Sequence, residues 1–137
     1  MKTLFSKIID GELPSYPIYE DEDIFVFLDA FPATKGHCLV VPKEPTEDVL
    51  SADPHVVARC NIVAQAIAKA SLEALGATGV NILTNAGEVS GQTVDHYHVH
   101  IIPRYTKEEL QFVHEQNQAD KADVQSVYQS ALASLKA

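Results

Sequence analysis

With 137 residues and 46% apolar content, the chain is large enough to bury the core of one globular domain. Its 10 basic and 19 acidic side chains give a net charge of −9, which argues against binding to a nucleic-acid backbone or an anionic membrane, because both need clustered lysine and arginine. A small anionic substrate is still allowed, since a few local hydrogen-bond donors can hold one phosphate group.

The N-terminal segment and the cysteines indicate a compartment. The segment MKTLFSKIIDGELP lacks the long apolar stretch of a signal peptide, and no run of the sequence approaches membrane-spanning length. Cys38 and Cys60 do not have the spacing of a disulfide framework, so both are expected as reduced core residues. A cytoplasmic location is therefore expected.

The first half of the chain predicts one short helix and three strands. Apolar residues recur at helical spacing from Leu4 until Gly11 and Pro14 interrupt the pattern. The acidic turn at 20–23 separates two short β-rich runs, as in a hairpin, and a turn-forming cluster at 31–36 precedes a third run. The expected elements are a helix over 4–13 and strands over 18–19, 24–28 and 37–42.

The second half predicts a long helix, two more strands and a terminal helix. Residues 54–75 carry one apolar stripe at helical spacing, and Gly76 is suited to cap the end of that helix. Two β-rich runs, at 79–85 and 96–104, lie on either side of a turn-rich loop, and apolar spacing over 124–135 predicts the terminal helix. Strands in hairpin succession with segregated helices predict an α+β fold with a mostly antiparallel sheet of about five strands.

Histidine occupies every second position at the start of the last expected strand. Because the side chains of a strand alternate between its faces, His96, His98 and His100 are expected on one face and Tyr97 on the other. Neutral imidazole is both a nucleophile and a metal ligand, so this motif favours either covalent catalysis or a metal site such as zinc. Three alternate positions span about 13 Å, which makes one shared ion awkward, although two of the rings and His37 could converge.

Residues elsewhere in the sequence could join the histidines in one site. His37 opens a strand directly after Gly36, where a side chain can face either the core or a cleft. Asp29 ends an apolar strand and is either a turn former or an acceptor for ligand hydroxyl groups. Asn85 is an ordinary turn residue unless its loop faces the histidines, and backbone N–H groups of 87–91 could cradle a phosphate.

Together, these segments resemble the histidine triad (HIT) superfamily, on its Hint-like bacterial side. The family signature of His, apolar, His, apolar, His, apolar, apolar is written here as HYHVHII. The resemblance covers most of the first 105 residues and is carried by FSKIIDGELP, YEDEDIFVFLDAFP, KGHCLVVPK, NILTNAGEVSGQTV and HVHIIPR. It implies a single HIT domain over 1–137, with 106–137 a divergent C-terminal tail, and a homodimer.

The resemblance implies a nucleotide-binding hydrolase or transferase that acts at the α-phosphate of nucleoside phosphoramidates or related nucleotidyl substrates. The central histidine of the family is its nucleophile, which places on His98 the role of forming a nucleotidyl-histidine intermediate. In that scheme the backbone carbonyl of His100 holds the other ring nitrogen of His98. His37, His96 and His100 complete the implied catalytic set. The alternatives are a dinucleoside polyphosphate hydrolase and a noncatalytic purine-nucleotide sensor.

The implied ligand is a purine nucleotide such as AMP, and no cofactor is expected. Asp29 matches the acid that accepts hydrogen bonds from the ribose hydroxyl groups. Asn85, Gln92 and Thr93 match positions that contact the phosphate. The implied walls of the base pocket are Phe5, Ile8, Ile9, Phe27 and Leu28.

A structural zinc site of many bacterial relatives is not expected in this chain. Those relatives carry a Cys-x-x-Cys pair and a further histidine, which bind zinc together with the first triad histidine. Here the three positions are Thr3, Ser6 and Pro45. Thiolate is the stronger zinc ligand and proline has no side-chain donor, so three of the four ligands are missing.

Overall fold

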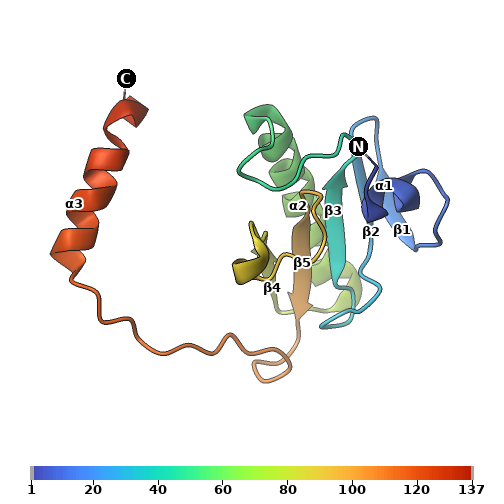
Figure 1. Cartoon of the computed structure of the whole chain (residues 1–137). Coiled ribbons are helices and arrows are strands. Elements are labelled where there is room, and N and C mark those ends of the chain that lie inside the picture. Colours follow the sequence, from blue (N-terminus) through green and yellow to red (C-terminus); the bar gives the residue numbers. More distant parts are fainter. Residues whose placement is uncertain (1, 137) are drawn as a thin grey trace.

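The structure, a computed structural model, describes residues 2–136, which form one sheet, a long helix across it and several shorter helices (Figure 1). The elements in chain order are α1 (Leu4–Ile9), β1 (Pro17–Glu20), β2 (Ile24–Leu28), β3 (Cys38–Pro42), α2 (Pro54–Leu75), β4 (Gly79–Leu83), the 3-10 helix η1 (Glu88–Ser90), β5 (Val99–Arg104), α3 (Lys121–Ala131) and the 3-10 helix η2 (Ala133–Lys136). The strand order is β1-β2-β3-β5-β4, and all neighbouring pairs are antiparallel. The expected α+β class and five-stranded antiparallel sheet are confirmed.

Local signals in the sequence set both ends of α2. The carboxylate of Asp53 accepts a hydrogen bond from the backbone N–H of His55, and Pro54 occupies the first helical position, where its missing N–H costs nothing. At the other end Gly76 adopts a left-handed conformation, with φ 75°, that favours glycine. The helix therefore begins and ends where the sequence predicted.

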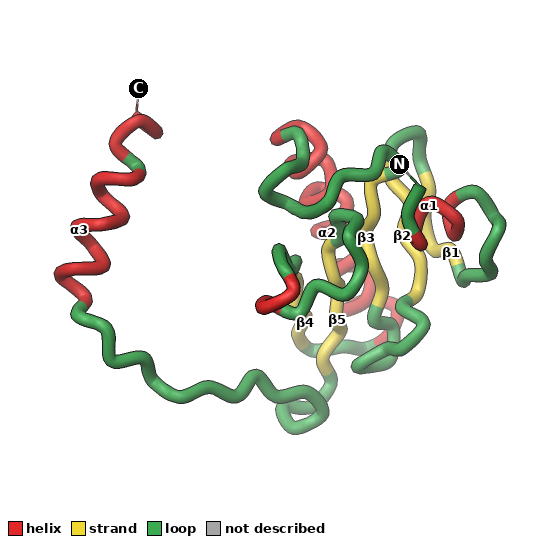
Figure 2. Tube along the Cα trace, in the orientation of Figure 1, coloured by secondary structure: helices red, strands yellow, loops and turns green. Residues whose placement is uncertain are grey.

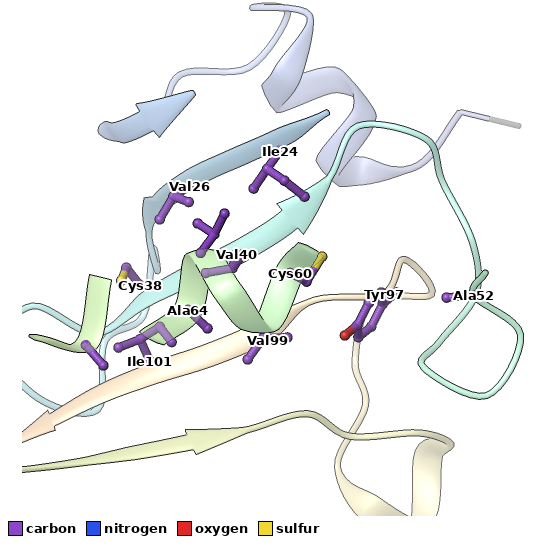
Figure 3. Packing of buried hydrophobic residues seen from close by; sticks show 12 residues of the cluster. Ile24, Val26, Cys38, Val40, Ala52, Cys60, Ala64, Tyr97, Val99 and Ile101 are labelled. Carbon is purple, nitrogen blue, oxygen red and sulfur yellow. The ribbon is translucent and has the colours of Figure 1, made fainter. Parts of the chain in front are cut away.

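The two faces of the sheet carry separate apolar clusters. Because strand residues alternate, Ile24 and Val26 of β2 join the cluster under α2, whereas Phe25 and Phe27 join a second cluster with Phe5 of α1. Figure 3 shows the α2 cluster, whose side chains come from the sheet, from α2 and from the segment before β5. The sheet therefore separates the α1 side from the α2 side.

The strand β5 begins later than the sequence predicted. Its pairing with β3 starts at Val99, and the backbone N–H of Tyr97 donates instead to the carbonyl of Thr46, in the loop before α2. His96 and His98 therefore precede the strand, and His100 lies within it. The alternation still holds, because Tyr97 packs in the α2 cluster, whereas the rings of His96 and His98 lie against Phe5 of the other cluster.

The C-terminal tail leaves the domain after Arg104. Residues 107–110 fold back around Arg104, whose guanidinium donates to the carbonyls of Lys107 and Leu110. Residues 111–120 then form an extended loop, and α3 stands apart from the sheet (Figure 2). The side chain of Asp120 accepts from the N–H of Ala122 and so caps the start of α3. The predicted terminal helix is present.

Both cysteines are buried in the α2 cluster with free thiols, as expected. Burial raises the pKa of Cys38 and of Cys60 to about 12, so neither is a reactive thiolate at neutral pH. Over the described part of the chain, no helix combines the length and apolar character needed to cross a lipid bilayer.

Candidate active site

Four histidines from two distant parts of the sequence gather on the α1 side of the sheet. His37 directly precedes β3, while His96, His98 and His100 lie before and within β5. The ring centres of His98 and His100 are 4.9 Å apart, and those of His37 and His100 are 5.2 Å apart. The ring of Phe5 stands edge-on to His98 at 5.0 Å, so α1 forms an apolar wall of this group.

The ring of His98 has one nitrogen committed and one free. Its Nδ1 lies 2.6 Å from the backbone carbonyl oxygen of His96, so Nδ1 carries the proton and donates it to that bond. The nitrogen Nε2 therefore keeps its lone pair. Burial lowers the pKa of His98 below its usual value, which favours the neutral ring at neutral pH.

The acceptor for His98 differs from the one implied by the family resemblance. The implied carbonyl is that of His100, whereas the structure uses that of His96, two residues before His98. His100 lies inside β5, opposite Leu39 of β3 and Leu83 of β4, where its backbone is engaged in the sheet. The hydroxyl of Thr84 donates to the carbonyl of His98 at 2.6 Å and so holds this part of the backbone.

A chain of hydrogen bonds fixes the proton positions of His37 and His100. The backbone N–H of Ala33 donates to Nδ1 of His37 at 2.9 Å, so the proton of His37 is on Nε2. That Nε2 lies 3.0 Å from Nδ1 of His100, which therefore accepts. The proton of neutral His100 is consequently on its Nε2, so His100 presents an N–H donor.

Burial and two neighbouring rings keep His100 uncharged. Its pKa is lowered to about 4, first because the ring is shielded from water and second because His98 and His37 lie close by. Asp29 opposes this shift without reversing it. At neutral pH, His100 therefore acts as a hydrogen-bond donor and not as a cation.

His96 is a structural residue, which corrects its expected catalytic role. The ring is completely buried, its Nε2 donates to the carbonyl of Pro42 at 2.8 Å, and its Nδ1 accepts from the hydroxyl of Thr3 at 2.6 Å. The same hydroxyl of Thr3 accepts from the backbone N–H of Ser6 at 3.0 Å and caps α1. With both ring nitrogens bonded to protein, His96 offers no free nitrogen for chemistry.

Asp29 lies at the edge of the histidine group and forms a turn, the first of the two roles that the sequence left open. Its Oδ1 accepts from the backbone N–H of Phe31 at 2.8 Å, which forms a turn, and its Oδ2 lies 3.4 Å from Nε2 of His37. Asp29, His37 and His100 place one ligand atom each within 4.8 Å of one another. Among residues 2–136, these three, and not the three histidines of the motif, are placed to hold a metal ion.

The glycine-containing loop before β5 is held from within by Gln92. The side-chain oxygen of Gln92 accepts from the N–H of Gly87, and its amide donates to the carbonyls of Glu47 and Val94. Both amide hydrogens are thereby used and the residue is buried. The side chain of Gln92 is therefore not free to make the phosphate contact that the family resemblance implies. Thr93 is exposed in the same loop.

Asn85 and the glycines of this loop are close together. Gly87 and Gly91 have φ of 94° and 106°, which favour glycine, and they flank η1. A side chain at Gly91 would come within 3.5 Å of Nδ2 of Asn85. Asn85 therefore lies across the loop from Gly91, next to the segment that leads to the histidines.

The expected base pocket is only partly assembled on the histidine side. Phe5 and Phe27 pack edge to face at 5.5 Å, and Ile8 and Ile9 lie against the same cluster. Leu28 was wrongly included, because it lines an apolar groove with α2 on the opposite face of the sheet. Neighbouring strand residues point to opposite faces, so Phe27 and Leu28 do not share a pocket.

Comparison with known proteins identifies similar chains and structures. The HIT domain profile matches residues 10–107. Protein hit of Bacillus subtilis is 44% identical over 104 residues, which are 76% of this chain and 72% of that protein. Adenylylsulfatase HINT3 of Arabidopsis thaliana is 39% identical over 101 residues, 74% of this chain and 51% of HINT3. The crystal structure of a HIT family protein from Bacillus anthracis superposes with a TM-score of 0.87 at 36% identity, over 96% of this chain and 95% of that one.

Proposed function

The chain belongs to the HIT family of nucleotide-binding hydrolases and transferases, and we propose that it cleaves nucleoside phosphoramidates or related nucleotidyl substrates at the α-phosphate through His98. One observation carries this proposal. Two neutral rings with centres 4.9 Å apart present complementary groups, a free lone pair on Nε2 of His98 and an N–H on Nε2 of His100. Such a pair suits attack on an electrophile that develops negative charge.

Both reactive nitrogens are open to a substrate. The buried side-chain atoms without a hydrogen-bond partner, among the described residues, are Oγ1 of Thr46 and the hydroxyl of Tyr97. Nε2 of His98 and Nε2 of His100 also lack a protein partner, but they do not belong to that buried group, so both atoms are accessible to solvent. These two nitrogens therefore reach the surface of the site.

In the first step Nε2 of His98 attacks the α-phosphorus. A nitrogen–phosphorus bond to the ring forms while the bond from phosphorus to the leaving nitrogen breaks. The leaving nitrogen takes up one proton from solvent and departs as the neutral amine. The ring becomes cationic, so its Nδ1–H bond to the carbonyl of His96 becomes charge-assisted and stronger. Nε2–H of His100 donates to a phosphoryl oxygen as charge develops there.

In the second step a water molecule displaces the ring. Its oxygen bonds to phosphorus, the bond from phosphorus to His98 breaks, and one water proton passes to solvent. His98 returns as neutral imidazole with its Nδ1 proton still held by the carbonyl of His96. The product is the nucleoside monophosphate.

Asp29 and the two phenylalanines provide the proposed nucleoside site. The carboxylate of Asp29 has acceptor capacity beyond its bond to the N–H of Phe31, so it can accept from ribose hydroxyl groups. Phe5 and Phe27 form an apolar wall beside His98, which suits a base. Asn85 and Thr93 border the phosphate side in this proposal.

Release of AMP from adenosine phosphoramidate tests the proposal. The wild type and His98→Ala are compared with excess EDTA and without it, and His114→Ala, at an exposed position, is the control for a histidine loss. We expect release that survives EDTA, persists in His114→Ala and vanishes in His98→Ala. Release that requires a metal ion would overturn the mechanism, and tight AMP binding without any release would favour a nucleotide sensor.

AMP binding by calorimetry tests the role of Asp29 separately. A hydrogen bond to a charged acceptor contributes about 1.5–3 kcal/mol, so Asp29→Ala should weaken binding about ten- to a hundredfold. His98→Ala should bind AMP nearly as well as the wild type, because the nucleophile contributes to the chemical step. Unchanged binding in Asp29→Ala would refute the ribose assignment.

A further inference from the structure

One loop carries most of the candidate site, and a side chain joins its two ends. The loop is residues 84–98, which connect β4 to β5. It has the proposed nucleophile His98 at its last position and Asn85 near its start. Thr84, its first residue, donates from its hydroxyl to the backbone carbonyl of His98 at 2.6 Å. The first and last residues of the loop are therefore linked directly.

Thr84 acts where the pairing of the strands has already ended. The pairing of β5 with β3 includes Val99 but not His98. The pairing of β4 with β5 ends with Leu83 opposite His100. Thr84 and His98 therefore both lie just beyond the paired residues of the two strands. The hydroxyl of Thr84 supplies there the donor that a backbone N–H supplies within the sheet.

Other contacts hold the same loop against the segment before α2. The amide of Gln92 donates to the carbonyl of Glu47, and the backbone N–H of Tyr97 donates to the carbonyl of Thr46 at 2.7 Å. These two bonds attach the middle and the end of the loop to its surroundings. The bond from Thr84 has a different effect, because it attaches the end of the loop to its own start.

This link joins the nucleophile to the phosphate side of the proposed site. Asn85, which borders that side, directly follows Thr84 and lies across the loop from Gly91. The ring of His98 is tied through Nδ1 to the carbonyl of His96, so the ring moves with the backbone of its own segment. Attack at phosphorus requires the nucleophile and the phosphate-binding groups at a fixed separation. One hydroxyl group connects the two segments that set this separation.

We propose that Thr84 is a positioning residue, whose hydroxyl holds His98 in line with a phosphate bound beside Asn85. The inference rests on the proposed function, and Thr84 acts through the backbone of His98 rather than on the substrate. Without the hydroxyl, the two ends of the loop are free to separate, and the ring of His98 moves with its end. A displacement of about 1 Å at a reacting group can cost about a hundredfold in rate.

Thr34 offers a matched control for the loss of a threonine hydroxyl. Its hydroxyl donates to the backbone carbonyl of Pro103 at 2.6 Å, the same length as the bond from Thr84 to His98. Pro103 lies near the far end of β5. Thr34→Val and Thr84→Val therefore remove the same kind of hydrogen bond from the two ends of one strand. The two variants differ in whether the lost bond held the proposed nucleophile.

Steady-state release of AMP from adenosine phosphoramidate tests the positioning role. We expect kcat of Thr84→Val to be about ten- to a hundredfold below that of the wild type, with AMP affinity by calorimetry unchanged. Thr84→Ser, which keeps the hydroxyl, and Thr34→Val should both keep kcat near that of the wild type. A wild-type kcat in Thr84→Val, or an equal loss of kcat in both valine variants, would overturn the proposal.

The ¹⁵N signals of the His98 ring test the same role without turnover. They are assigned by their absence in His98→Ala, and they report the proton on Nδ1 and the lone pair on Nε2. We expect them to shift or broaden in Thr84→Val and to stay unchanged in Thr34→Val. If the wild type releases no AMP, the proposed function fails, and a change of these signals confined to Thr84→Val still supports the positioning role. Unchanged signals in Thr84→Val would refute it.

Discussion

Replacing Thr3 by valine tests the hydrogen bonds that join α1 to the histidine segment. The hydroxyl of Thr3 lies 2.6 Å from Nδ1 of His96 and accepts from the N–H of Ser6 at 3.0 Å. Valine keeps the shape of threonine but has no hydroxyl group. The substitution therefore leaves a completely buried ring nitrogen without a partner and removes the N-cap of α1.

The expected loss of stability follows from these two contacts. A buried polar atom left unpaired costs about 1–3 kcal/mol, and a lost N-cap costs about 1 kcal/mol. The free energy of unfolding should therefore fall by roughly 2–4 kcal/mol, which is a large part of the stability of a domain of this size. Thr3→Ser keeps the hydroxyl group and should cost less than about 1 kcal/mol.

Urea denaturation followed by circular dichroism measures the difference. Thr3→Val should unfold at a clearly lower urea concentration than Thr3→Ser, with an unchanged slope m. If the two variants unfold together, the hydroxyl of Thr3 contributes nothing, and the structural role assigned to His96 is wrong.

Acidification from pH 6.5 towards 4 should lower the free energy of unfolding. Burial lowers the pKa of His100 to about 4 in the folded chain, whereas the same histidine takes up a proton near pH 6.5 in the unfolded chain. Urea titrations at several pH values should show a weaker pH dependence of the unfolding free energy in His100→Gln than in the wild type. Gly36→Ala should lower Tm more than Gly11→Ala. Both glycines have positive φ, 90° and 81°, but only at Gly36 would the added Cβ clash with Cδ1 of Leu75. AMP release should stay high below pH 6.5 and decline only at more acidic pH, since burial lowers the pKa of His98; a rate profile with its midpoint at 6.5 or above would contradict this.

Elements with local signals were predictable from the sequence, and α2 shows why. Its capping aspartate, its first proline and its final glycine lie within the helix or next to it, so the sequence predicted Pro54–Leu75 to the residue. The start of β5 was not predictable in this way. Tyr97 donates its N–H to the distant loop residue Thr46, and this tertiary contact delays the strand until Val99.

The alternation of side chains along β2 is enough to exclude Leu28 from the base pocket. Phe27 and Leu28 are consecutive in a strand, so their side chains point to opposite faces and only Phe27 lies with the histidines. The hydrogen bond of Thr84 to the histidine segment could not be predicted from the sequence in this way. Its hydroxyl reaches the carbonyl of His98 across 14 positions of sequence, and nothing in the local pattern indicates that contact.

Burial explains why the fold itself sets the chemistry of these histidines. A shielded imidazole loses its charge, and its nitrogens then need hydrogen-bond partners or an opening to solvent. His96 and His37 have protein partners on both nitrogens, so their rings are held in place. His98 and His100 each have a protein partner on Nδ1 alone, and the direction of that hydrogen bond decides whether Nε2 carries the proton. His98 donates from Nδ1 and keeps a free lone pair at Nε2, as the proposed nucleophile requires, whereas His100 accepts at Nδ1 and presents an N–H donor at Nε2. Two identical side chains thereby acquire opposite roles.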